Sequence, residues 1–243
     1  NIIEACLEMG VRRLVYTSSI HALGRPKEGT TVDETVEFDQ INPSGAYDRT
    51  KAVASALVQE AAKNGLDAVI VLPTGVIGPN DFRRSEMGEM VLAWMQQKPS
   101  ISTDGAYDFV DGRDIAEWHI LAASLGRSGE AYLLSGTQVT ISEYRKLVQE
   151  AAGICSHEIK IPGWFLKLIA PLAEFHYKIT RTRPRITKYA IETLQGNSRV
   201  TCLKAETELG YRHRPLRETV VDTVQWWREN QKQIKPSLRT SSL

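Results

Sequence analysis

Tyr47 and Lys51 are two side chains that could together transfer a proton. They are four residues apart in the segment Tyr47-Asp-Arg-Thr-Lys51, and this spacing places both on one face of a helix, about one turn apart. A free phenol ionises at about pH 10 and is a poor acid or base at neutral pH, but a nearby ammonium group stabilises the phenolate. Taken alone, such a pair also arises by chance on surface helices.

Thr17, Ser18 and Ser19 form a second polar group, at the point where a strand is predicted to end. A hydroxyl beside a phenol can hydrogen-bond a carbonyl oxygen, and it can stabilise the alkoxide that forms when a hydride is delivered to the carbonyl carbon. The alternative role for either serine is a turn or helix-cap hydroxyl. The two groups together indicate a site for carbonyl chemistry.

The expected secondary structure brings these groups together. Arg13–Ser18 is rich in β-branched and aromatic residues, Ala46–Lys63 has helical spacing, and Leu66–Leu72 is nearly all apolar, as in a strand that is buried on both faces. Strand, helix and strand with short connections predict an α/β fold with a doubly wound parallel sheet. Ligands bind beyond the carboxyl ends of such strands, here Thr17–Ser19 and Pro73–Gly75.

The rest of the chain first continues this alternation and then becomes mostly helical after Gly136. Further helices are expected at Asn1–Met9, Met87–Gln97 and Asp111–Leu125, and further strands at Tyr107–Val110 and Ala131–Ser135. The helical part is expected at 142–152, 164–180, 187–194, 203–209 and 216–231. Trp118 and His119 are expected to pack on the sheet, and the pair Trp226-Trp227 to be one buried and one half-buried.

The composition is that of an ordinary globular protein, with 243 residues, 42% hydrophobic, 24% charged and a formal net charge of +1. Nucleic-acid binders usually carry a clear basic excess, so no nucleic-acid partner is expected. No segment approaches the roughly 18 apolar residues that a membrane helix needs, so no membrane partner is expected. Three widely separated cysteines show no metal-ligand spacing, which predicts reduced thiols, a cytoplasmic location and no metal site.

Four segments of the chain resemble the extended short-chain dehydrogenases/reductases, the NAD-dependent epimerase/dehydratase family. They are Gly10-Val-Arg-Arg-Leu-Val-Tyr-Thr-Ser-Ser19, Tyr47-Asp-Arg-Thr-Lys51, Leu72-Pro-Thr-Gly-Val-Ile-Gly-Pro79 and Phe109-Val-Asp-Gly-Arg-Asp-Ile-Ala116. Because they occur in order and at the right separations, together they are far more specific than any one of them. The resemblance extends from Asn1 to about Asn230.

The resemblance implies a catalytic site and a cofactor, either NADP or NAD. Tyr47 would be the general acid/base, Lys51 would bind the nicotinamide ribose and tune Tyr47, and Ser19 would polarise the substrate carbonyl. Cofactor contacts are also implied for Thr17, Ser18, Pro73, Thr74, Gly75 and Val76. A homodimer is possible through the helix that carries Tyr47, although core packing would explain its apolar residues equally well.

The chain departs from the family in lacking the Gly-rich turn G-x-x-G-x-x-G. The helix at Asn1 resembles the one before the family's fifth strand, so we expect the N-terminal part, with its pyrophosphate-binding helix end, to be missing. The residue that decides between NAD and NADP would lie there, and this fragment alone is expected to bind cofactor poorly and to be inactive. Residues 1–78 and 104–136 would then form the C-terminal part of an NAD(P)-binding Rossmann domain, 79–103 and 137–235 a substrate-binding portion, and 236–243 a disordered tail.

Two features favour one branch of the family. Nucleotide-sugar 4,6-dehydratases carry an acidic pair after the strand-end hydroxyl, where this chain has Ile20-His21. Epimerases usually place an Arg before the Val-Asp segment to bind a diphosphate, where we find Asp108. The chain therefore resembles dihydroflavonol-4-reductase-like enzymes more closely, which predicts reduction of a small-molecule carbonyl. The alternatives are a nucleotide-sugar epimerase and an inactive truncated or cofactor-sensing protein.

Three further residues are candidates for substrate binding. His21 is two residues past Ser19 and either lines the substrate pocket or completes a loop hydrogen bond. Asn80 and Arg83 are candidates for contact with an acidic substrate group, the alternative being a solvated helix start. The identity of the substrate does not follow from the sequence.

Overall fold

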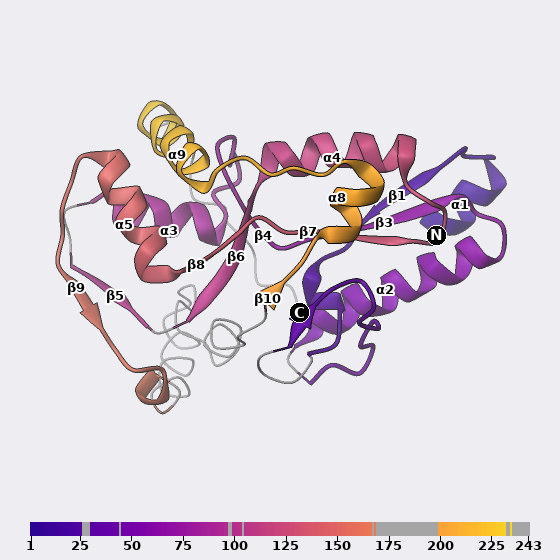
Figure 1. The fold of residues 1–243 in the computed structure, drawn as a ribbon, viewed down its shortest axis with the longest axis horizontal. Coiled ribbons are helices and arrows are strands. Elements are labelled where there is room, and N and C mark those ends of the chain that lie inside the picture. The colour runs from indigo at the N-terminus through magenta and orange to yellow at the C-terminus, as the bar shows by residue number, and fades with distance from the viewer. Residues whose placement is uncertain are drawn as a thin grey trace. The chain divides into compact units, whose positions relative to one another are not determined.

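A computed structural model describes residues 1–25, 30–43, 45–96, 99–103, 105–166, 168, 199–231 and 234. The chain divides into two compact units. The first contains Asn1–Val76, Asp108–Gln138 and Gly196–His213, and the second contains Ile77–Tyr107, Val139–Gln195 and Arg214–Leu243. Figure 1 labels the elements of both units.

The first unit is built on a parallel sheet of three strands in the order β1-β3-β7. The strands are β1 (Leu14–Thr17), β3 (Ala68–Pro73) and β7 (Ala131–Leu134). Both pairings are parallel, so the carboxyl ends of all three strands lie at the same edge (Figure 1). The predicted α/β fold with a parallel sheet is confirmed.

The central strand β3 is buried at every residue, and its side chains alternate between two apolar clusters. Ala68, Ile70 and Leu72 pack in a cluster that includes Val58 of helix α2 (Ala46–Lys63). Val69 and Val71 point the other way, because successive side chains of a strand face opposite sides of the sheet. Helices therefore cover both faces, as the near-continuous apolar sequence of this strand predicts.

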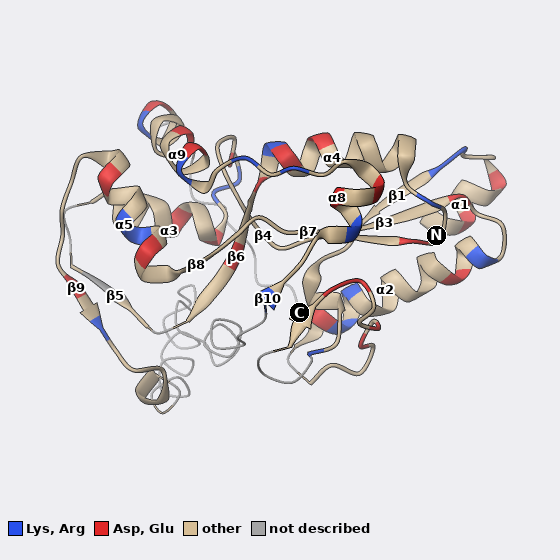
Figure 2. Ribbon diagram, viewed as in Figure 1, with Lys and Arg blue, Asp and Glu red and all other residues tan. Residues whose placement is uncertain are grey.

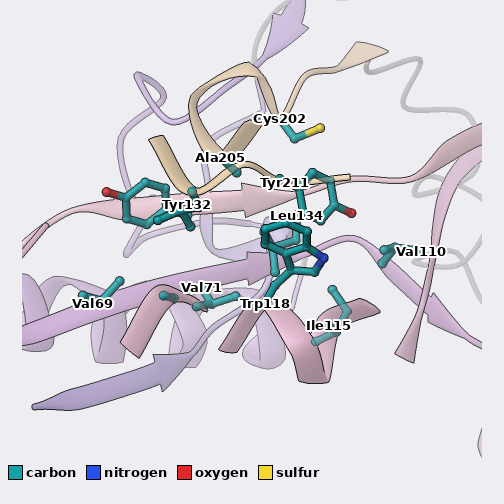
Figure 3. Packing of buried hydrophobic residues seen from close by; sticks show 12 residues of the cluster. Val69, Val71, Val110, Ile115, Trp118, Tyr132, Leu134, Cys202, Ala205 and Tyr211 are labelled. Atoms are coloured by element: carbon teal, nitrogen blue, oxygen red, sulfur yellow. The ribbon is translucent and has the colours of Figure 1, made fainter. Parts of the chain in front are cut away.

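Helices α4 (Gly112–Leu125) and α8 (Leu203–Leu209) supply the second cluster, which Figure 3 shows at close range. The rings of Trp118 and Tyr211 meet edge to face with their centroids 4.5 Å apart. The Tyr211 hydroxyl donates to the carbonyl oxygen of Ser135 at 2.5 Å. These contacts place Gly196–His213 in the first unit, whereas the sequence-based division assigns all of 137–235 to a substrate-binding portion.

Two side chains bind the outward-facing main-chain groups of β7, at the edge of the sheet. The Leu133 N–H donates to Glu34 Oε1 at 2.7 Å, and Lys204 Nζ donates to the Ala131 carbonyl at 2.8 Å. The carbonyls of Glu130, just before β7, and of Leu134 at its end point toward β3, since they accept from the N–H groups of Ile70 and Thr74. Two main-chain groups on the side of β7 away from β3 are thus bound by side chains.

Short elements complete the first unit. They are α1 (Ile2–Glu8), the 3-10 turn η1 (Ile20–Ala22) and the parallel pair β2 (Thr31–Val32) and β10 (Arg199–Val200). A three-stranded sheet follows the order β4-β6-β8, with β4 (Gly75–Ile77), β6 (Ala106–Asp111) and β8 (Thr137–Thr140). The chain passes from one unit to the other within each of these three strands.

The second unit contains three helices with defined bounds, a helical segment at 163–166 and one strand pair among its described residues. The helices are α3 (Glu86–Trp94), α5 (Ile141–Ala152) and α9 (Leu216–Asn230), and β5 (Ser100–Ser102) pairs in parallel with β9 (Glu158–Lys160). Trp94 and Tyr144 join α3 to α5 edge to face, and Arg228 of α9 donates to the Ala152 carbonyl at 2.7 Å.

The remaining sequence-based expectations for this part of the chain have mixed outcomes. Trp227 is fully buried and Trp226 half-buried, as predicted. The expected helices at 164–180 and 187–194 lie almost entirely outside the described residues, and so does the expected tail at 236–243.

Charged residues of both signs are interspersed along the described helices, as Figure 2 shows. This distribution agrees with the near-zero net charge of +1. In the part of the chain that the structure describes, no helix has the length and apolar character that crossing a membrane requires. Within the same residues, no group of three or more His, Cys, Asp or Glu side chains could hold a metal ion.

Gly136 provides a test of the packing at the end of β7. A Cβ atom added there would lie 2.0 Å from the carbonyl oxygen of Phe109, a main-chain atom that cannot move cheaply. We expect Gly136→Ala to lower the free energy of unfolding by about 1–3 kcal/mol or more. Chemical denaturation followed by circular dichroism measures this change.

The matched control is Gly24→Ala, where an added Cβ meets no atom closer than 3.6 Å. That substitution should change the free energy of unfolding by less than about 1 kcal/mol, with a small gain possible because the unfolded chain loses entropy. Equal effects of the two variants would contradict the described packing of Gly136.

Candidate functional site

Tyr47 and Lys51 lie in the first two turns of α2, whose bounds agree with the sequence-based prediction. Tyr47 is 52% exposed. The ammonium of Lys51 donates to the Thr17 carbonyl at 2.9 Å and lies 5.6 Å from the centre of the Tyr16 ring. Lys51 therefore joins the start of α2 to the carboxyl end of β1, which sets the phenol of Tyr47 at the ligand-binding edge expected for parallel strands.

The side chain of Thr17 is already engaged by helix α4. His119 Nε2 lies 2.7 Å from Thr17 Oγ1, and His119 Nδ1 lies 2.6 Å from the Ile115 carbonyl oxygen. A carbonyl can only accept, so Nδ1 carries the hydrogen, and in the neutral imidazole Nε2 accepts from the Thr17 hydroxyl. Thr17 thus serves the site through its carbonyl on Lys51, while His119 has the structural role that the sequence indicates.

The structure gives the two serines at the end of β1 different surroundings. Both serines are buried, and they differ in their hydrogen bonds. The Ser18 hydroxyl lies 2.6 Å from the hydroxyl of Ser55, which itself donates to the Lys51 carbonyl. Ser19 Oγ accepts from the His21 N–H at 3.3 Å and caps η1. A serine that accepts this bond keeps its own O–H as a donor. These contacts favour Ser19 over Ser18 as the group that meets a substrate oxygen.

The segment after β3 is anchored through Thr74. Its hydroxyl donates to Asp108 Oδ1 at 2.6 Å, and the Gly136 N–H donates to the same oxygen at 2.8 Å. Burial raises the pKa of the Asp108 carboxyl, although both hydrogen bonds oppose this change. Asp108 therefore holds the ends of β3 and β7 together, so its carboxylate is not directed at a substrate.

The other candidate residues fall into different parts of the molecule. Pro73 is buried within β3, whereas Val76 is 44% exposed in β4 and follows the half-buried Gly75. His21 stands next to Tyr47, with ring centroids 6.1 Å apart in an edge arrangement. Asn80 and Arg83 are exposed residues of the second unit. The first unit thus assembles Ser19, His21, Tyr47 and Lys51, without those two residues.

The groups around Tyr47 suit the nicotinamide end of a dinucleotide. Lys51 has ammonium hydrogens beyond the one that it gives to Thr17, and Tyr47 presents an exposed phenol, so the pair can bind ribose hydroxyls. A Gly-rich turn that would bind the pyrophosphate is not present in this sequence. The residues described here therefore fit part of the cofactor.

The roles of two acidic residues in this region, Asp48 and Asp108, were not predicted from the sequence. Asp48 reads as a spacer within Tyr47-Asp-Arg-Thr-Lys51, and Asp108 reads only as a residue that cannot bind phosphate. Both prove to be buried. A carboxylate next to Tyr47, on the helix side that faces the sheet, is the one signal that could have identified Asp48.

Comparison with known proteins gives a family and several relatives. The family model that matches is that of the NAD-dependent epimerase/dehydratase family, over residues 1–135. The sterol demethylase protein B of Methylococcus capsulatus is 32% identical, over 94% of this chain and 70% of its own length. A putative dihydroflavonol 4-reductase of Synechocystis is 25% identical, over 95% of this chain and 68% of its own length.

Among solved structures, the crystal structure of gox2253 is similar to this chain with a TM-score of 0.77 and 29% sequence identity. The match covers 96% of this chain and 71% of that protein. The likeness in sequence and the likeness in fold therefore extend over the same large part of the chain.

Asp108 provides a test of the anchor at the ends of β3 and β7. We expect Asp108→Ala to cost about 1–3 kcal/mol of unfolding free energy, because it leaves the Thr74 hydroxyl and the Gly136 N–H without their acceptor. Asp108→Asn retains an oxygen that can accept both bonds and should cost less. Urea denaturation of both variants measures the difference.

The pH dependence gives a second readout. Burial raises the pKa of Asp108, so its contribution to stability is fully present below the unfolded value of about 3.9 and is lost as the pH rises through the folded pKa. Asp108→Asn has no carboxyl to ionise and therefore does not lose stability in this way. The unfolding free energy of Asp108→Asn should accordingly come closest to that of the natural protein, or exceed it, at neutral pH. The opposite trend would show that the carboxyl is not held in a buried environment.

Proposed function

The chain belongs to the NAD-dependent epimerase/dehydratase family, and we propose that the protein is an NAD(P)-dependent oxidoreductase that reduces a carbonyl at Ser19, Tyr47 and Lys51. The predicted resemblance to extended short-chain dehydrogenases/reductases is confirmed at the level of the family. The observation that carries the proposal is the bond from Lys51 Nζ to the Thr17 carbonyl, 2.9 Å long. It holds the exposed phenol of Tyr47 beside the strand end that bears Ser19.

The proposed mechanism assigns one step to each of these side chains. NAD(P)H, when bound, supplies the hydride. The Ser19 hydroxyl donates a hydrogen bond to the substrate oxygen and stabilises the negative charge that develops there. Tyr47 gives its phenolic proton to the resulting alkoxide, and the positive charge of Lys51, one turn along α2, favours the phenolate that remains. Tyr47 and Lys51 also bind the ribose of the cofactor.

The surroundings of the site support reduction over the chemistry of other family members. Ile20 and His21 follow Ser19, so no carboxylate stands where a dehydratase would need one. Asp108 is occupied by Thr74 and Gly136, which leaves no phosphate-binding group at that position. A cofactor-sensing or inactive protein would not need Ser19, Tyr47 and Lys51 in this arrangement.

The relatives suggest which carbonyl compounds to test. They are named for a sterol demethylase and for a dihydroflavonol reductase, so we propose an apolar cyclic ketone or its alcohol as the substrate class. The experiment is NADH and NADPH oxidation by the full-length protein with sterol ketones, dihydroflavonols, simple aldehydes and nucleotide sugars. Redox-neutral interconversion of a nucleotide sugar, without net cofactor oxidation, would instead establish the epimerase alternative.

We also propose that the protein forms a homodimer and is located in the cytoplasm. Val53 and Leu57 are 40% and 57% exposed on α2, the helix through which a homodimer could form. The three cysteines Cys6, Cys155 and Cys202 are free of disulfides, in agreement with the proposed cytoplasmic location. Analytical ultracentrifugation of the full-length protein tests the dimer.

Tyr47→Phe tests the assigned acid directly. Removing the hydroxyl abolishes proton transfer while retaining the ring, so we expect kcat/KM for the carbonyl substrate to fall by about 100-fold or more. The matched control is Tyr132→Phe, which removes a phenol that bonds Arg127 and Glu208 away from the site. Steady-state kinetics of both variants decide the role, and near-normal turnover by Tyr47→Phe would exclude it.

Ser18→Ala and Ser19→Ala separate the two serines. Ser18→Ala leaves the buried hydroxyl of Ser55 without this partner and should cost about 1 kcal/mol of unfolding free energy with little loss of turnover. Ser19→Ala should reduce kcat by about 10-fold or more, and because it also removes the cap of η1 it should cost about 1 kcal/mol of unfolding free energy, as Ser18→Ala does. If Ser18→Ala instead caused the larger loss of kcat, the assignment of Ser19 would be wrong.

A further inference from the structure

Asp48 is a buried carboxylate directly beside the proposed acid. It follows Tyr47 in the first turn of α2, and its side chain is 1% exposed. Burying a carboxylate is costly unless other groups compensate its charge. The mechanism above gives Asp48 no part in binding or proton transfer, so its burial next to Tyr47 calls for another role.

The groups that compensate Asp48 come from the segment after Ser19. His21 Nδ1 lies 4.0 Å from Asp48 Oδ1, and Arg25 Nη2 lies 3.6 Å from Asp48 Oδ2. Both residues belong to the stretch that begins with η1, which packs against α2. One carboxylate of the helix that carries Tyr47 thus contacts two cationic or ionisable side chains of the segment that carries Ser19.

This segment is also fixed to the chain that follows it. The Asp39 N–H donates to the Ala22 carbonyl at 3.0 Å, the Gly24 N–H donates to the Glu37 carbonyl at 2.9 Å, and Leu23 forms an antiparallel bridge with Phe38. Main-chain hydrogen bonds thus hold this segment in position on one side, and the ion pairs with Asp48 hold it on the other.

His21 connects Asp48 to the ring of Tyr47. Its ring contacts Tyr47 edge to face at 6.1 Å and 71°. Burial lowers the pKa of His21, the negative charge of Asp48 opposes this, and Arg25 lowers it further. The His21 ring therefore lies between the carboxylate of Asp48 and the phenol of Tyr47.

We propose that Asp48 is a positioning residue, which holds His21 against the ring of Tyr47 and, through Arg25, holds the segment after Ser19 against α2. The hydroxyl of Ser19 and the phenol of Tyr47 are thereby kept at one separation, matched to a single substrate oxygen. This inference rests on the proposed function, because it assigns Asp48 a task only if Tyr47 and Ser19 act on the same atom. A displacement of about 1 Å in such a pair is enough to reduce turnover by about 100-fold.

The alternative for Asp48 is a purely structural role. A carboxylate in the first turn of a helix interacts favourably with the helix N-terminus, and this would contribute to stability without concerning Tyr47. Asp48→Asn separates the two roles, because it retains the size of the side chain and removes the charge that His21 and Arg25 face.

The test is a double-mutant cycle in the full-length protein with its carbonyl substrate. We expect Asp48→Asn to lower kcat by about 10- to 100-fold while KM for NAD(P)H changes less than about twofold. His21→Gln should cause a similar loss, and the double variant should be no worse than either single one. In a Tyr47→Phe background, Asp48→Asn should have no further effect on residual turnover.

Controls and a second readout keep the inference falsifiable. Asp33→Asn removes a carboxylate of the same loop that bonds Thr35, and it should leave kcat unchanged. Arg25→Lys retains the charge and should retain most activity, while Arg25→Ala should not. If Asp48→Asn does not fold, His21→Gln and Arg25→Ala carry the test. The proposal is overturned if the loss of kcat in Asp48→Asn adds fully to the loss in His21→Gln or in Tyr47→Phe. It is also overturned if Asp48→Asn lowers the melting temperature and leaves kcat unchanged.

NMR of the histidine and tyrosine rings separates this inference from the proposed function. In Asp48→Asn the pKa of His21 should fall further, because the attraction of the carboxylate is removed, and the ring signals of Tyr47 should move. If Tyr47→Phe retains full turnover, the proposed function fails whatever the NMR result. An unchanged His21 titration and unchanged Tyr47 signals in Asp48→Asn overturn the positioning role independently of any activity.

Discussion

The burial of β3 on both faces is the constraint from which the arrangement of the first unit follows. Every residue of Ala68–Pro73 is buried, so each face of the sheet must be covered, by α2 on one side and by α4 and α8 on the other. A parallel sheet covered in this way has one edge where all carboxyl ends meet. The start of α2, which carries Tyr47, is brought to that edge by the same packing that buries Val58.

Some polar side chains at this edge form hydrogen bonds that maintain the fold, and others retain a hydroxyl that can bind a substrate. The hydroxyls of Thr17, Ser18 and Thr74 are bound to His119, Ser55 and Asp108, respectively. Tyr47 is exposed, and Ser19, although buried, accepts only a long bond from the His21 N–H and retains its own O–H. The position of a hydroxyl at a strand end is therefore a weak indicator of a catalytic role. The hydrogen-bond partners that the hydroxyl already has within the protein are a stronger indicator.

Much of this organisation could be predicted from the sequence, because the long elements have strong periodic patterns. Ala46–Lys63 has the predicted bounds, and the strand expected at Leu66–Leu72 is found at Ala68–Pro73. The two- and three-residue strands β2, β10, β5 and β9 were not predicted, since such short parallel pairs have no local signature. The packing of Gly196–His213 in the first unit and the contact of Asp48 with His21 depend on residues far apart in the chain. Periodicity carries no information on such contacts.

The side chains that bind the outer edge of β7 also decide how the sheet can grow. An unpaired strand edge presents main-chain groups that recruit further strands, including those of other molecules. At β7 the outward groups of Leu133 and Ala131 are taken by Glu34 and Lys204. Among the described strands of this sheet, β1 is the other edge. Glu34 and Lys204 thus occupy two of the main-chain groups that a further strand would need at β7, which makes pairing at this edge less favourable than at an open strand edge.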